Sequence, residues 1–226
     1  MNQLKGPISI ILKDFKIQFY IFTAITLALV IIYNMVGFYV GPDNFHPFIS
    51  GPIYGIILFL PFFMFGDAFK STIGLGGTRT NYLTSLIISD LLFIISLMVV
   101  HNVLFQLSGL LTDKTMSTAH VFHIASLFGG LNVMSYFWVD MLVGILLVGT
   151  GTFISAALYR FGYVWTLGIA IGLGVFGYLW FVLGDMSEVL TWVFENMYLT
   201  LHLLGGLGVV CAVLTYPLIK QVTLKP

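Results

Sequence analysis

Six apolar runs, joined by short polar connections, limit what this chain can fold into more than any other feature. About twenty apolar residues are enough to cross a bilayer as a helix. Of the 226 residues, 59% are hydrophobic and 8% are charged, which leaves no material for a large soluble domain. We therefore predict an all-α integral membrane protein with about six transmembrane helices in one domain, residues 1–226. The runs cover residues 20–40, 52–65, 83–107, 136–158, 163–183 and 197–217.

The second run, residues 52–65, is the least certain span. It is shorter than a usual span and contains Pro61, which removes a helical hydrogen bond. A tilted, kinked or partly re-entrant segment is the alternative to a full crossing. Without a crossing here, Lys70 and Arg79 would lie on the outer side, and the charge asymmetry of the loops would weaken.

The positions of the basic residues predict the orientation. With a cytoplasmic N-terminus and six spans, eight of the nine lysines and arginines fall on the inner side, and Lys114 falls outside. Cytoplasmic loops carry an excess of these two residues. We therefore expect both termini in the cytoplasm, and a multi-pass protein of a bacterial-type cell membrane.

The N-terminal segment, residues 1–19, is amphipathic. Pro7 suits the first position of a helix, and Lys13 and Lys16 lie on a polar flank. We predict a helix along the cytoplasmic interface, because its apolar residues share one face. The alternative is a frayed start of the first span; a cleavable signal peptide does not fit the interrupting charges. The apolar face holds Ile8, Ile11, Leu12, Phe15 and Phe19.

The connection between the second and third runs, residues 66–82, predicts a helical elbow. A short helix should begin at about Asp67 and stop at Gly76 and Gly77, because glycine favours helix C-termini. Thr78 should cap the next helix. The elbow would present Lys70 and Arg79 to the cytoplasm, although both could be ordinary inner-side anchors.

A second connection, residues 184–196, precedes the last run. It carries three acidic residues, with Trp192 and Tyr198 at depths where aromatic residues favour the membrane interface. We predict an interfacial or re-entrant helical segment on the outer side. An outer loop with one extra helical turn is the alternative.

Together these features resemble the permease subunits of ABC transporters of the exporter class. The resemblance covers the whole chain. It rests on the six spans, the interfacial helix and an elbow with the pattern Gly-x-Thr-Arg-x-x-Tyr, formed by Gly76, Thr78, Arg79 and Tyr82. It implies that the elbow docks into a groove of a separate cytoplasmic ATPase, and that two permeases pair as a homodimer or with a paralogue. The implied docking residues are Asp67, Lys70, Gly76, Gly77, Thr78, Arg79, Asn81 and Tyr82.

The resemblance implies export, and the apolar side chains that dominate the spans favour an amphipathic or hydrophobic substrate such as a peptide, a drug or a lipid. The chain has no Gly-x-x-x-x-Gly-Lys-[Ser/Thr] loop, so ATP and Mg are expected on the partner ATPase. We therefore expect no cofactor in this chain and no catalytic residue. The formal net charge is zero, so nothing indicates a nucleic-acid partner.

Ionisable residues within the runs favour a rival function. His101, Asp140 and His202 all fall in the outer half of the predicted topology and could line one translocation path. A proton- or ion-coupled secondary transporter would use such groups. The alternative is that each one bonds to a neighbouring helix or lies among the headgroups.

Two further patterns carry weaker hypotheses. His120 and His123 have the spacing of some helical metal ligands, but two ligands do not make a site, so we predict no metal and an outer interfacial helix instead. Gly168 and Gly172 form a Gly-x-x-x-Gly pattern that permits close helix contact. We expect that contact within the chain, with contact between two copies as the alternative.

Overall fold

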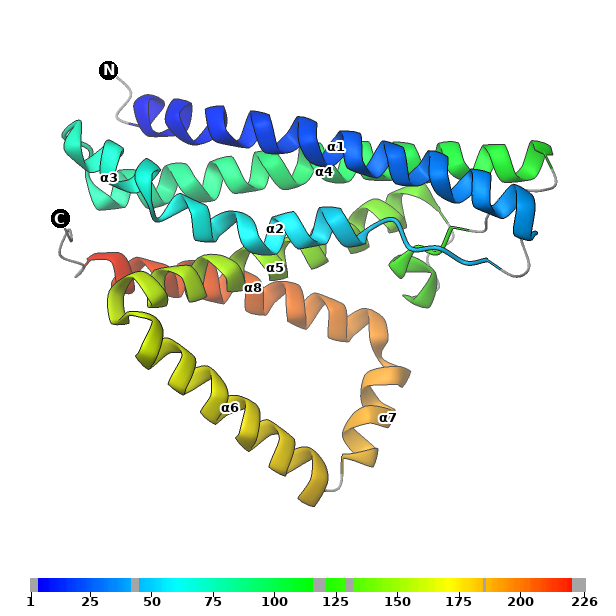
Figure 1. The fold of residues 1–226 in the computed structure, drawn as a ribbon. Helices are drawn as coiled ribbons and strands as arrows, with labels where there is room; N and C mark the ends of the chain where they lie inside the picture. Colours follow the sequence, from blue (N-terminus) through cyan, green and yellow to red (C-terminus); the bar gives the residue numbers. More distant parts are fainter. Residues whose placement is uncertain (1–3, 42–44, 116–120, 129–131, 185, 221–226) are drawn as a thin grey trace.

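The part of the chain that the structure describes is almost entirely helical. A computed structural model describes residues 4–41, 45–115, 121–128, 132–184 and 186–220 (Figure 1). Six stretches of this part are long and apolar enough to cross a membrane, as expected for a multi-pass helical membrane protein. The elements are α1 (Lys5–Val40), α2 (Gly51–Met64), α3 (Asp67–Gly74), α4 (Arg79–Thr115), η2 (Ile124–Phe128), α5 (Val133–Phe161), α6 (Tyr163–Leu183), α7 (Ser187–Glu195) and α8 (Met197–Lys220).

The long helices form a bundle in which α1 lies beside α4, and α5 packs against both α2 and α8. The start of α1 and the end of α8 lie at the same end of the bundle as α3 (Figure 1). The predicted outer segment 184–196 contains the short helix α7, which joins α6 to α8. The end of the bundle that faces the cytoplasm remains a prediction from the positions of the basic residues.

The N-terminal segment differs from the expectation. Residues 5–40 form one unbroken helix, so the structure does not support a separate interfacial helix. The physical reason is packing. Ile11 and Phe15, expected to face the interface, are 0% and 2% exposed, and the ring of Phe15 lies 4.9 Å from that of Phe93 on α4. The amphipathic pattern is thus explained by contact with α4.

The chain that leads into α2 is not helical. Residues 45–50 have no helical structure, and α2 begins only at Gly51. Pro61 is accommodated inside α2, where its carbonyl accepts a hydrogen bond from Ser155 of α5. With its 14 residues, α2 is too short to span alone; the stretch Gly51–Gly74, which includes α3, has 24 residues and is long enough.

Glycines bring α5 into backbone contact with its neighbours. A Cβ atom added to Gly149 would lie 2.0 Å from the carbonyl oxygen of Gly208 on α8, and one added to Gly151 would lie 2.6 Å from that of Leu58 on α2. By contrast, α6 turns away from α5 and α8 (Figure 1), and none of its residues is buried. Added Cβ atoms at Gly168 and Gly172 meet nothing within 4 Å, so the contact expected there is not made with any described residue of this chain.

Candidate functional sites

The elbow between α3 and α4 has the local structure that its sequence predicts. Gly76 has a φ of +83°, which favours glycine. Its N–H donates to Ile73, and the N–H of Gly77 donates to Thr72 at 2.9 Å, the paired bonds that end a helix at a left-handed residue. Thr78 then accepts a hydrogen bond from the N–H of Asn81 at 3.1 Å, so the predicted cap is confirmed.

Tyr82 lies inside the bundle. Its side chain is 0% exposed, its hydroxyl donates to the carbonyl of Met64, and its ring centroid is 5.0 Å from that of Phe69 on α3. Tyr82 therefore cannot touch a partner directly, in contrast to its implied docking role. It holds α2, α3 and α4 together, because one side chain contacts all three.

The other implied docking residues differ in availability. Arg79 lies at the elbow and donates from Nη1 to the carbonyl of Lys220 at 2.6 Å. It therefore provides a hydrogen-bond partner for a carbonyl group at the C-terminal end of α8. Lys70 and Thr78 are exposed, and Asn81 is half-buried. Asp67 begins α3, and its side chain lies outside the described part.

The tip of the elbow carries an apolar residue that sequence reasoning missed. Leu75 is 80% exposed and lines a groove of about 350 Å³ between the elbow and the start of α1. Contiguous apolar surface rimmed by polar groups marks interaction sites, and Leu75 adjoins the apolar side chains of Pro7 and Ile10 in this groove. In the sequence, this residue could have been recognised as a single leucine between two glycines. The groove is also lined by Pro7, Ile10, Thr72, Gly76 and Asn81.

A second site lies among polar side chains that converge from four segments. Two extended segments pair here: the N–H of Phe122 donates to the carbonyl of Pro47 at 2.8 Å, and a parallel bridge joins Phe48 to Phe122. This pairing carries the residues after each segment into the interior, against α4 and α5. The site, here called the polar network, consists of Ser50, Tyr54, His101, Asn102, His123 and Asp140.

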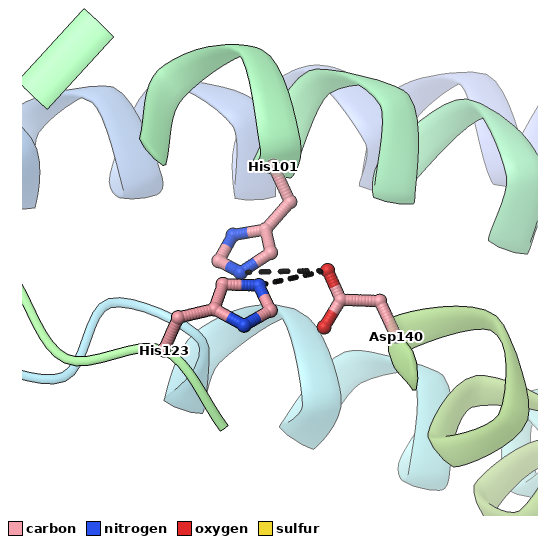
Figure 2. A group of neighbouring side chains, drawn as sticks. All are labelled: His101, His123 and Asp140. Atoms are coloured by element: carbon pink, nitrogen blue, oxygen red, sulfur yellow. Dashed lines mark hydrogen bonds and ion pairs between the residues drawn. The ribbon is translucent and has the colours of Figure 1, made fainter. Parts of the chain in front are cut away.

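Asp140 of α5 is the centre of the polar network. It is 0% exposed. Its Oδ1 accepts from the Tyr54 hydroxyl, and its Oδ2 accepts from Asn102 at 2.8 Å and from His123 Nε2 at 3.2 Å. Figure 2 shows the rings of His101 and His123 turned toward this carboxyl group, with His101 Nε2 at 3.9 Å. The three donors satisfy both oxygens of this buried carboxyl group.

The tautomer of His123 follows from its two contacts. Its Nδ1 accepts a hydrogen bond from the N–H of Ala125 at 3.0 Å, so this nitrogen carries no proton. The Nε2 atom of the neutral ring then carries the proton and donates it to Asp140. Phe105 and Tyr136 pack against the ring, with centroids 4.8 and 4.6 Å away. His123 is therefore held as a neutral donor.

The same geometry bears on metal binding. One ligand atom from each of His101, His123 and Asp140 lies within 4.8 Å of the others, which is the donor set of some zinc sites. A ligating histidine normally donates its other ring N–H to an acceptor, whereas His123 Nδ1 accepts one. A metal on His123 Nε2 would have to displace the bond from Ala125. The hydrogen bonds of the polar network are thus complete around Asp140 without a metal, and the nearby His101 Nε2 is hydrogen-bonded to the Ser50 hydroxyl at 2.9 Å.

The structure brings together two of the three predicted path residues. His101 and Asp140 meet, but His202 does not join them: on α8 it accepts from Trp138 Nε1 at 3.0 Å and contacts the Tyr198 carbonyl at 2.8 Å. His123 takes its place. His120 lies outside the described residues, and His123 lies in extended chain, so the expected shared helix is wrong at His123.

Comparison of the chain with protein-family models, with curated proteins and with solved structures finds no match. What is shown is a helical protein with six potential membrane spans. A proposal for its function therefore depends on the elbow and the polar network.

Proposed function

We propose that this chain is the transmembrane subunit of an ATP-driven exporter of the ABC type, coupled to a separate cytoplasmic ATPase. Two permeases would pair around the path of an amphipathic or hydrophobic substrate. The partner would bind ATP and Mg, while this chain would transmit the resulting movement to its helices.

The elbow is the observation that supports this proposal. Its backbone bonds are satisfied by the helix-ending motif of α3 and the cap of α4, and Tyr82 fixes it to the end of α2. Leu75 extends from this rigid turn with 80% of its surface exposed. A partner that grips Leu75 would therefore move α2, α3 and α4 together.

The test is a mild-detergent pull-down of the tagged chain from its native membrane, followed by partner identification and an ATPase assay. A stoichiometric soluble ATPase should accompany the unaltered chain. Leu75→Asp should weaken that association by about 2 kcal/mol or more, roughly thirtyfold, because it places a charge in an apolar contact. Lys70→Glu should weaken it less, as a peripheral charge.

Leu75→Met is the matched control, because it keeps an apolar tip of similar volume and should leave the complex intact. Arg79→Glu is a less specific probe, because it also breaks the contact with Lys220. A chain that is recovered alone, or a complex that is unchanged by Leu75→Asp, would contradict the docking role of the elbow.

A proton-coupled secondary transporter is the second candidate, and the polar network favours it. A carboxylate with 0% exposure lies 3.9 Å from an imidazole that can take up a proton, an arrangement used to couple proton binding to transport. In this case His101 and Asp140 would be the coupling residues, with His123 in the role expected of His202.

The two candidates differ in their energy source. Cells that overproduce the chain can be tested for resistance to a panel of amphipathic compounds, with and without an ionophore that collapses the proton gradient. If the exporter proposal is right, resistance should persist with the ionophore and in Asp140→Asn. Resistance that is lost in both tests would favour the proton-coupled transporter instead.

A further inference from the structure

A second buried carboxylate, Asp90 of α4, lies outside both sites. Its side chain is 3% exposed, and within the described part of the chain its Oδ1 atom has no hydrogen-bond partner. The ion pairs found within 4 Å among the described residues involve Asp140 and not Asp90. An acidic group inside a membrane bundle is costly to bury without a partner, so the missing donor requires an explanation.

Asp90 lines a cavity of about 170 Å³ between α4, α5 and α8. The walls from α5 and α8 are apolar or already satisfied: Thr152 donates its hydroxyl to the carbonyl of Val148 at 2.6 Å, so it is not a donor for Asp90. The backbone contact between Gly149 and Gly208 forms part of the same wall. The cavity thus offers apolar surface and one carboxyl group.

The rim of the cavity reaches the outside of the bundle. Val209 and Val213 of α8 line it and are 52% and 64% exposed. Side chains exposed at this depth of a membrane helix face the bilayer, so a molecule could enter sideways from the lipid. The cavity has room for a headgroup and its first carbon atoms, while a longer chain would extend along these valines.

The chemistry of the cavity selects among cations. Metal ions such as Ca²⁺ and Mg²⁺ need about six oxygen ligands, and this cavity supplies one carboxyl group. A primary ammonium group carries three donors and can satisfy a carboxylate while its alkyl chain contacts the apolar walls. A bound proton would also neutralise Asp90, but it would leave the apolar cavity without an occupant.

We propose that the Asp90 cavity binds the ammonium group of an amphipathic primary amine that enters from the bilayer. The inference that this amine represents the transported substrate class rests on the proposed function, whereas binding itself does not require an ATPase.

The experiment uses the full chain in lipid nanodiscs and an alkylamine that carries a diazirine close to its amino group. After photolysis, the labelled residues are mapped by mass spectrometry. Labelling should map to the walls of the cavity on α4, α5 and α8. Excess dodecylamine should compete with it, whereas excess dodecanol, which matches the chain but lacks the charge, should not.

Two variants test the carboxylate and the cavity separately. Asp90→Asn keeps the volume and removes the charge, and it should reduce labelling about tenfold or more, as expected for loss of a charged hydrogen bond. Ala212→Phe fills the cavity from α8 and should abolish labelling. Val210→Phe is its matched control, since Val210 is 53% exposed on the same helix and does not line the cavity.

Each outcome decides the proposal. Equal labelling of Asp90→Asn and the unaltered chain, competition by dodecanol, or equal loss in Ala212→Phe and Val210→Phe would overturn it and would indicate that Asp90 simply holds a proton. Recovery of an ATPase partner without specific amine labelling would leave the exporter proposal standing and remove this substrate class. Specific labelling without any ATPase partner would support amine binding at Asp90 and contradict the exporter proposal.

Discussion

Among the described residues, two carboxyl groups are buried in the bundle, those of Asp140 and Asp90, and their surroundings are opposite in kind. Asp140 is surrounded by three hydrogen-bond donors and a histidine, whereas Asp90 Oδ1 has no donor among the described residues. His101 and Asp90 lie on the same side of α4, about 16 Å apart along its axis. Burial alone is therefore a poor guide to function. A buried acid whose oxygens accept hydrogen bonds can belong to a site that is complete, whereas one without a donor indicates a missing partner.

The residues between the two acids keep them separate. Ile94, Leu97 and Met98 are all 0% exposed on the intervening stretch of α4, so an apolar layer divides the polar network from the Asp90 cavity. The comparison can therefore be tested one acid at a time, because sites without shared partners have nearly additive effects.

The largest expected effect comes from placing leucine at each acid in turn. Asp140→Leu should lower the free energy of unfolding by about 3 kcal/mol or more, because it leaves three buried donors without an acceptor at about 1–3 kcal/mol each. Asp90→Leu should leave stability unchanged or raise it, because it removes an unpaired polar group. Denaturant titration in detergent micelles, followed by tryptophan fluorescence, measures both. Equal losses of unfolding free energy in the two variants would contradict the difference between the surroundings of the two acids.

A smaller effect should follow from separating α5 and α8 beside Asp90. Gly149→Ala places a methyl group against the backbone of Gly208 and should destabilise by about 1–3 kcal/mol through overpacking. It should also alter amine labelling at the cavity. Gly168→Ala on α6 is the control, since open space surrounds that glycine, and it should be neutral or slightly stabilising. Similar losses in both would show that α6 is packed in the membrane.

The smallest effect should come from removing one donor of the polar network. Tyr54→Phe deletes the hydroxyl that donates to Asp140 and should destabilise by about 1 kcal/mol, because the carboxylate keeps its other two donors. The same denaturant titration applies, with Tyr178→Phe as the control on exposed α6. A loss as large as that of Asp140→Leu would mean that Tyr54 alone holds the charge.

Much of the fold could be predicted because its signals are local. The apolar runs are long enough to mark every span except the second, and the elbow follows from glycines and a threonine at the positions that end and begin helices. The contact between Gly149 and Gly208 was also within reach, as close packing through small residues. The sequence did not predict which helices pack against one another. For this reason α6 was expected to pack within the chain.

The polar network shows where local reasoning stops. His101 and Asp140 were found because ionisable residues are rare in spans, but the role of His123 depends on the pairing of two extended segments that are far apart in sequence. Its spacing from His120 indicated a helix instead. Similarly, Ile11 and Phe15 form an amphipathic pattern whether lipid or α4 covers them, and the pattern alone does not distinguish the two.

The extended chain before α2 has a consequence for assembly in the membrane. Residues 45–50 lie outside the helices, and any part of such backbone that enters the bilayer must have its N–H and carbonyl groups satisfied inside the protein. Part of that cover comes from Phe122, which is synthesised much later, and His101 meets the Ser50 side chain. The second crossing should therefore reach its final place only after α4 and the segment beyond it have entered the bilayer, which makes it one of the last parts of the N-terminal half to settle.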